Sequence, residues 1–122
     1  MSLRKIDGFN RIYCFDSFFG EYEKLFGKNK AEYQRHLQKL YENLYILDNG
    51  KDAIRMPRFE KLVNAGNLYA IRHITKINPR VIFAFQRSDG VVVLLTSFKE
   101  GSSSDYNAAL SRAKSLMKEL EE

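Results

Sequence analysis

The sequence is short of several residue types, and each shortage argues against a class of protein. A single cysteine, Cys14, in 122 residues excludes a disulfide framework, and with only two histidines it also argues against a zinc site. No apolar run approaches the roughly 18 residues that span a bilayer, and the N-terminus lacks the pattern of a signal peptide. We therefore expect a cytoplasmic protein with no disulfide bonds and no membrane partner.

Glycine and proline are also scarce, at seven and two residues. The sequence contains no P-loop, no glycine-rich nucleotide-binding motif and no pair of catalytic carboxylates. No Ser–His–Asp grouping is evident either, so the run Ser102–Ser104 is interpreted as a loop and helix cap rather than a nucleophile. We expect no metal and no small-molecule cofactor.

What the sequence does contain is typical of one globular domain over residues 1–122. Hydrophobic residues make up 44% and charged residues 29% of the chain, and sixteen Phe and Tyr residues provide a sizeable core for its length. No repeat or linker divides the chain. A single domain is therefore predicted.

Apolar spacing predicts the helices, and β-branched or aromatic runs bounded by turn signals predict the strands. In order these are a strand at Arg11–Phe15, a helix capped by Asp16 or Ser17 and ended by Gly27, a helix from Asn29 to Asn49, strands at Leu68–Thr75, Arg80–Gln86 and Val91–Phe98, and a helix from about Ser104. The segment Lys51–Asn67 reads as a short helix from Pro57 to about Val63 or as a loop. The sequence thus predicts an α+β domain: a mainly antiparallel four-stranded sheet with an N-terminal helical hairpin and a C-terminal helix. The last two strands are apolar on both faces, so both faces are expected to be covered.

Positive charge is concentrated in the middle of the chain. Residues 51–100 hold nine Lys and Arg against four Asp and Glu, which equals the net charge of +5 of the whole protein. A local basic excess attracts polyanions, of which nucleic acid is the commonest. A solvated basic face is the alternative explanation.

Two arginines within this basic segment are expected to lie close together. Arg72 is near the end of one predicted strand, and Arg80 opens the next, so an antiparallel hairpin brings them to one end of the sheet. Unpaired, they would repel each other, and a bound phosphate would relieve the repulsion. The alternative is that Arg72 is paired with Glu60, Asp89 or Glu100. Lys99 and Tyr106 follow the last strand and are expected near the same edge of the sheet.

Three segments of the sequence resemble a known family. They are "LYAIR", "RVIFAFQRSDGVVVLLTSFKE" and a helix containing "ALSRAKSLM", and they resemble the RelE/ParE toxin superfamily of bacterial toxin–antitoxin systems, with the HigB-like, phage-derived branch closest. The resemblance covers about Pro57–Leu120. Ala70 stands where the family usually has glutamate, and Glu100 stands where a second lysine is common.

The resemblance implies a RelE-like fold and the toxin of a type II system. It implies an endoribonuclease, or mRNA interferase, that cuts messenger RNA in the ribosome without a metal and so inhibits translation. The implied partners are messenger RNA, the ribosome and a cognate antitoxin, expected to be a helix-turn-helix protein. The alternatives are a ParE-like toxin that binds a protein target such as DNA gyrase, and an inactive nucleic-acid-binding relative.

The resemblance also implies roles for individual residues. Arg72 would stabilise the scissile phosphate and Arg80 would position it, while Lys99 would contact phosphate or transfer a proton. Tyr106 and His73 would stack on a base or transfer a proton. The remaining cations of the basic segment are expected to contact RNA, namely Arg55, Arg58, Lys61, Lys76 and Arg87.

Overall fold

The computed structural model describes residues 3–49, 59–62, 65–72, 75, 77–86, 90–101 and 103–121. Within these ranges the elements are β1 (Leu3–Lys5), β2 (Ile12–Phe15), α1 (Phe18–Lys24), α2 (Lys30–Asn49), β3 (Phe59–Lys61), β4 (Leu68–Arg72), β5 (Pro79–Gln86), β6 (Val91–Lys99) and α3 (Ser103–Glu121). The predicted α+β class with three helices is confirmed for this part of the chain.

The sheet differs from the predicted one in size and in element order. It has six strands in the order β1-β2-β6-β5-β4-β3, where four were expected. The four middle strands are the predicted ones, and the two additional strands, β1 and β3, are three-residue edge strands. β3 also corrects the helix expected from Pro57, because Phe59–Lys61 pairs antiparallel with β4. Strands this short carry too few residues for a period-two pattern to be recognised.

The sheet is mixed because one of its pairs is parallel. β2 pairs in parallel with β6, and the other four neighbouring pairs are antiparallel. A parallel pair needs a long crossover, which α1, α2 and the strands that follow them provide. The two central strands of the sheet, β5 and β6, both lie within the basic segment of residues 51–100.

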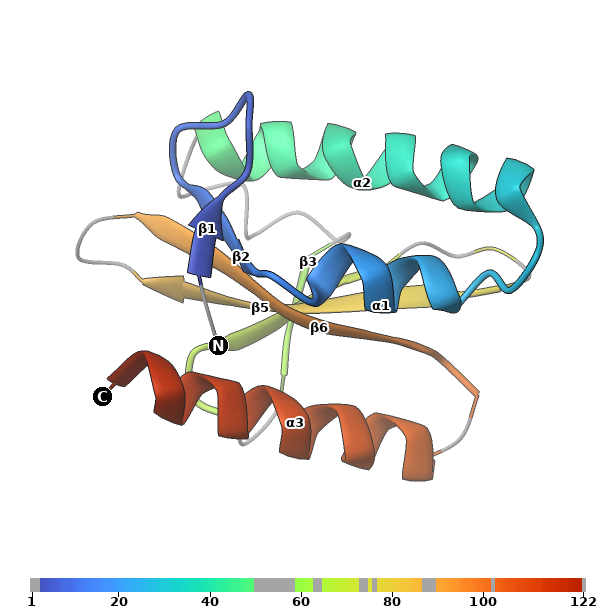
Figure 1. The fold of residues 1–122 in the computed structure, drawn as a ribbon. Coiled ribbons are helices and arrows are strands. Elements are labelled where there is room, and N and C mark those ends of the chain that lie inside the picture. Colours follow the sequence, from blue (N-terminus) through green and yellow to red (C-terminus); the bar gives the residue numbers. More distant parts are fainter. Residues whose placement is uncertain are drawn as a thin grey trace.

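The helical hairpin forms as predicted, with one difference at its start. The Asn29 side chain accepts a hydrogen bond from the Glu32 amide at 3.1 Å and so caps α2, and Gly27 ends the preceding turn with a φ of +57°. Ser17 stands at the N-cap of α1 but makes no capping hydrogen bond. The two helices run in opposite directions (Figure 1). In the described ranges, no helix is both long and apolar enough to cross a bilayer.

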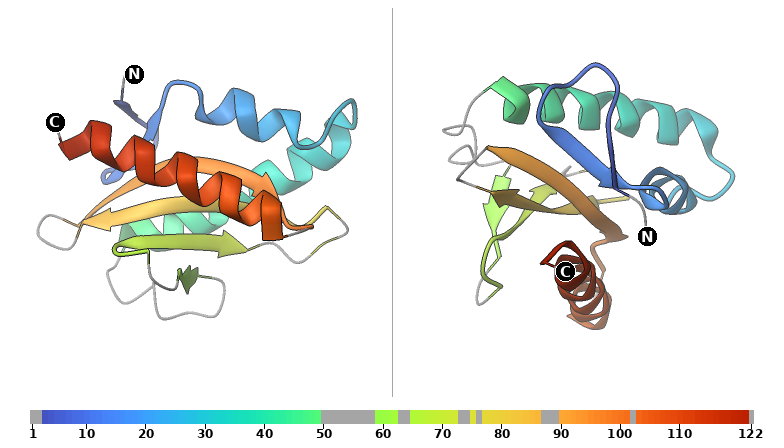
Figure 2. Two further views of the ribbon diagram at one scale, coloured as in Figure 1. Left: turned by 90° about the horizontal axis from the view of Figure 1, so that it is seen from below. Right: turned by 60° about the vertical axis from the view of Figure 1, so that its left-hand side comes forward.

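The sheet separates two hydrophobic cores, as its doubly apolar strands predict. α1 and α2 cover one face and α3 covers the other (Figure 2). Both cores contain fully or almost fully buried side chains from the helices and the sheet. They include Tyr22, Leu40, Leu44, Phe83 and Leu94 on the α1–α2 side, and Phe15, Leu68, Ile82, Leu95, Ala113 and Leu116 on the α3 side. Burial on both sides fixes which face each strand residue points to.

A β-bulge in β6 changes that assignment toward the end of the strand. Phe83 lies opposite Leu94, but the preceding residue of β5, Ile82, lies opposite Thr96, which leaves Leu95 without an opposite residue. An extra residue in one strand shifts the alternation of its side chains by one. From Thr96 onward, β6 residues therefore point to the face opposite to the one that simple alternation predicts.

Candidate functional site

Arg72 and Arg80 lie directly opposite each other on β4 and β5. Both point to the α3 face of the sheet, because Arg72 shares the alternation of Ala70 and Arg80 that of Ile82, and both of these belong to the α3-side core. The prediction that a hairpin brings the two arginines together is confirmed. We call the described residues around them the arginine site.

Two carboxylates of the protein already neutralise this pair. Glu60 on β3 places one oxygen 3.2 Å from Arg72 Nη1 and the other 4.0 Å from Arg80 Nη1. Glu100 binds Arg80 in a two-pronged pair, with 2.7 Å to Nη2 and 3.0 Å from the donating Nε. The expectation that the cations wait unpaired for a phosphate is therefore corrected. Of the two readings of Arg72, the pairing with Glu60 is the one observed.

The two arginines are held to different degrees. The Arg80 side chain is only 12% exposed and is clamped by Glu100, whereas Arg72 and Glu60 are each 37% exposed. Exposed ion pairs with a single contact contribute little, typically about 0–1 kcal/mol, while a forked pair is stronger and geometrically specific. Arg72 Nε is buried and has no hydrogen-bond partner in the structure. Arg72 is therefore the more available of the two guanidinium groups.

A pocket of about 410 Å³ adjoins the arginine site. Its lining is Glu60, Arg80, Phe98, Glu100, Gly101, Ser103 and Tyr106. Tyr106, in the first turn of α3, packs its ring against Phe98 with the centroids 6.1 Å apart and the planes at 55°. The predicted proximity of Tyr106 to Arg80 is thus confirmed. The pocket combines an aromatic wall with charged groups, the pairing with which proteins hold unstacked bases and phosphates.

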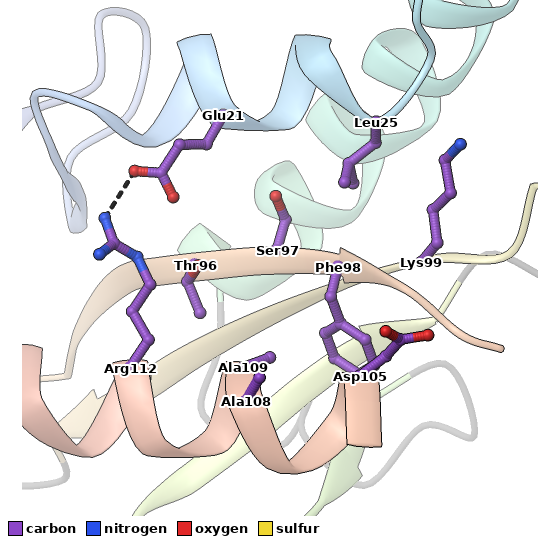
Figure 3. A pocket seen from close by; sticks show the side chains of 10 residues that line it. All are labelled: Glu21, Leu25, Thr96, Ser97, Phe98, Lys99, Asp105, Ala108, Ala109 and Arg112. Atoms are coloured by element: carbon purple, nitrogen blue, oxygen red, sulfur yellow. Dashed lines mark hydrogen bonds and ion pairs between the residues drawn. The ribbon is translucent and has the colours of Figure 1, made fainter. Parts of the chain in front are cut away.

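Lys99 does not join the arginine site. The bulge puts it on the opposite face of β6 from Phe98, and Figure 3 shows its side chain pointing away from α3. Lys61, exposed on β3, shares the face of Phe59 and so lies on the other side of the sheet from Glu60. These two predicted residues are therefore separated from the arginines by the sheet. The other predicted site residues fall outside the described residues, namely His73, Arg55, Arg58, Lys76 and Arg87.

A buried histidine that sequence reasoning did not single out belongs to a chain of hydrogen bonds that leads to the arginine site. His36 on α2 is 1% exposed, its Nδ1 lies 2.8 Å from the Glu32 carbonyl, and its Nε2 lies 2.8 Å from Thr75 Oγ1. The Thr75 amide donates to the Asn78 side chain, and the Asn78 carbonyl accepts from the Glu100 amide at 3.0 Å. This chain links α2 to the residue that clamps Arg80. Its sequence signal is a histidine between the apolar positions of a helix.

Asn78 shows why this turn needs support. It is a non-glycine residue with a φ of +47°. This left-handed backbone conformation is energetically unfavourable for any residue that has a side chain, although asparagine tolerates it better than most. Asn78 adopts this conformation while its side chain and its carbonyl are both hydrogen-bonded.

Within the described part of the chain, no three His, Cys, Asp or Glu side chains are grouped so as to hold a metal ion.

Comparison of the chain with models of known protein families gives no match, and comparison with curated proteins gives none. The resemblance to the RelE/ParE superfamily therefore stays a hypothesis drawn from the residues themselves. The geometry of the arginine site is what a functional proposal has to explain.

Proposed function

We propose that this protein is a RelE/HigB-like toxin of a type II toxin–antitoxin system, a cytoplasmic endoribonuclease that cuts messenger RNA in the ribosome without a metal. The observation that carries the proposal is the juxtaposition of Arg72 and Arg80 beside a pocket that also holds Tyr106. The resemblance of "LYAIR" and of the following segments supports it. A cognate helix-turn-helix antitoxin is the expected inhibitor.

The arrangement suits cleavage by the RNA's own 2′-hydroxyl. That reaction needs positive charge on the pentavalent phosphate, a base for the hydroxyl and an acid for the leaving oxygen. Arg72 would bind the phosphate and Arg80, fixed by Glu100, would orient it. Among the residues that line the pocket, the groups able to transfer protons are Glu60, Glu100 and the Tyr106 hydroxyl. Tyr106 would alternatively stack on a base.

A second function has a specific observation in its favour. The arginine site is balanced, with two guanidinium groups facing two carboxylates, and a surface of paired charges attracts an RNA backbone less than an unpaired basic one does. Such a surface fits a ParE-like toxin that binds a protein target such as DNA gyrase.

Induced expression in a bacterium, with mapping of messenger RNA ends, tests the proposal. The wild type should arrest growth and create new transcript ends, and Arg72→Ala should do neither while keeping its melting temperature. Lys114→Ala, which removes an exposed cation from α3, is the matched control and should behave as the wild type. Arg72→Ala with full toxicity would refute the cleavage mechanism. Growth arrest with intact transcripts and inhibited DNA supercoiling would establish the second function.

A further inference from the structure

The second half of β6 has an open edge among the described strands. β2 pairs with β6 only from Val92 to Leu94, although β6 continues to Lys99. Among the described strands, β6 has only β2 and β5 as neighbours, so the side of residues 95–99 that faces away from β5 has no described strand beside it. Such an edge presents main-chain donors and acceptors to a further strand.

The backbone groups that point outward can be identified from the hydrogen-bond pattern. The Glu100 amide donates to the Asn78 carbonyl on the β5 side. In an extended strand, amides two residues apart point the same way, so Phe98 also faces β5. Ser97 and Lys99 therefore direct their amide and carbonyl groups to the open edge.

This edge forms the floor of a groove of about 470 Å³ between α1 and α3 (Figure 3). Leu25, the residue directly after α1, lies on one wall, and the small side chains of Ala108 and Ala109 of α3 form the other. The Ser97 hydroxyl points into the space below α1 in Figure 3, and its oxygen is buried without a hydrogen-bond partner. The groove therefore has polar groups along its floor and apolar side chains on each wall, and Glu21, Asp105 and Arg112 add charge to its lining.

Each end of the groove carries one acidic and one basic side chain. At one end Glu21 and Arg112 form an ion pair of 2.6 Å that joins α1 to α3 across the groove (Figure 3). At the other end the exposed side chains of Lys99 and Asp105 both line the groove, with Lys99 on the α1 side of β6 and Asp105 on α3 (Figure 3). The ion pair limits how far an occupant can extend along β6 toward the end of β2. Beside Lys99, on the α1 side, a negatively charged side chain of the occupant is favoured, whereas Asp105 disfavours negative charge on the α3 side.

We propose that this groove binds an extended segment of a partner protein, which adds to β6 as a further strand. An added strand would bond to the outward groups of Ser97 and Lys99 and place alternate side chains against α1 and α3. The segment would carry a bulky apolar residue over Ala108 and Ala109, and an acidic residue beside Lys99. A helical occupant would leave the strand edge unused, because a helix satisfies its own backbone groups. The proposal does not depend on RNA cleavage.

A selection from a displayed library of random twelve-residue peptides, with the intact wild-type chain as bait, tests the proposal. Selected peptides should share an apolar residue and an acidic one, and binding should slow hydrogen exchange at the Ser97 and Lys99 amides. Copies of the peptides with every second amide N-methylated, in both registers, separate strand addition from simple burial in the groove. One of the two registers should bind about tenfold or more weakly, because its main-chain donors are blocked.

Two variants locate the site. Ala108→Arg fills the groove with a charged side chain, and Ser97→Pro removes an outward amide without breaking the ladder to β5. Each should weaken peptide binding about tenfold or more, while Asn107→Arg, on the outer face of α3, should bind as the wild type. Melting temperatures within a few degrees of the wild type show that each variant folds. A selection that yields no peptide sensitive to both Ala108→Arg and Ser97→Pro overturns the proposal, and so does equal binding of both N-methylated registers or protection confined to other amides.

Discussion

Replacing Glu100 by glutamine tests whether the arginine site serves an anionic ligand. Glu100 clamps Arg80 through two contacts, at 2.7 and 3.0 Å. Glutamine keeps the size of the side chain and one acceptor oxygen but removes the negative charge. The four charged groups Arg72, Arg80, Glu60 and Glu100 then change from balanced to a net single positive charge. The variant therefore changes the net charge of the arginine site while keeping the shape of the side chain.

The expected magnitudes follow from the exposure of the pair. Because Glu100 is 45% exposed, the lost attraction is worth about 1 kcal/mol rather than the larger value of a buried pair. A loss of that size lowers the melting temperature by about 4 °C in a domain of this length. The same free energy, now available to a phosphate at Arg80, would raise RNA affinity roughly fivefold. The slope of log affinity against log salt should steepen by about 0.7, the value for one more contact with a single strand.

The assay is fluorescence anisotropy with a labelled 2′-O-methyl RNA of mixed sequence, which lacks the free hydroxyl needed for cleavage. Titrations at several salt concentrations give both the affinity and the slope. Glu119→Gln makes the same charge change at an exposed position of α3 and is the matched control. If Glu100→Gln binds RNA no more tightly than Glu119→Gln, or with the same salt slope, the arginine site does not bind a nucleic acid backbone.

Two further predictions concern the support of the fold. His36→Ala should lower the free energy of unfolding by about 2–4 kcal/mol in urea titrations, because it leaves a cavity and removes the hydrogen bond to Thr75. Gln38→Ala, at an exposed position of the same helix, is the control. An equal effect of the two substitutions would contradict the supporting role of His36. Tyr22 is buried with its hydroxyl unpartnered, so Tyr22→Phe should leave stability unchanged or raise it by about 1 kcal/mol. Burial, assisted by nearby Tyr33, raises the pKa of Tyr22 above its usual value of 10.0, so the wild type should lose stability as the pH rises above 10, where the unfolded chain ionises first. Tyr22→Phe should lessen that loss, whereas Tyr45→Phe, at a residue 66% exposed, should not, and parallel pH profiles of all three proteins would contradict this prediction.

The elements that sequence reasoning found are those with a long periodic pattern. α2 repeats its apolar residues over 20 positions, and β5 and β6 are apolar runs separated by a turn signal. β1 and β3 are three residues each and are completed only by pairing with β2 and β4. Their existence is decided by tertiary contacts, which local sequence does not encode.

The candidate site was predictable to the extent that strand pairing determines it. The hairpin register placed Arg72 opposite Arg80, and Glu60 was among the partners considered for Arg72. Lys99 was misplaced because the single unpaired residue Leu95 reverses the alternation of β6. The position of this bulge depends on how β5 and β6 pair and pack against the two cores, so no pattern within β6 alone predicts it.

Arg72 and Arg80 are paired with carboxylates of different exposure and geometry, and this difference decides which arginine an RNA phosphate would bind first. To bind Arg72, a phosphate has to displace one Glu60 contact at 3.2 Å between side chains that are each 37% exposed, at a cost of about 1 kcal/mol or less. To bind Arg80, whose side chain is only 12% exposed, it has to open a fork of two contacts with Glu100, which costs more because two charge-assisted bonds are broken instead of one. Arg72 is thus the group that exchanges a carboxylate for a phosphate, while Arg80 acts as a fixed template. For this reason Arg72→Ala is expected to abolish activity with little effect on folding, whereas Arg80→Ala would change both and give an ambiguous result.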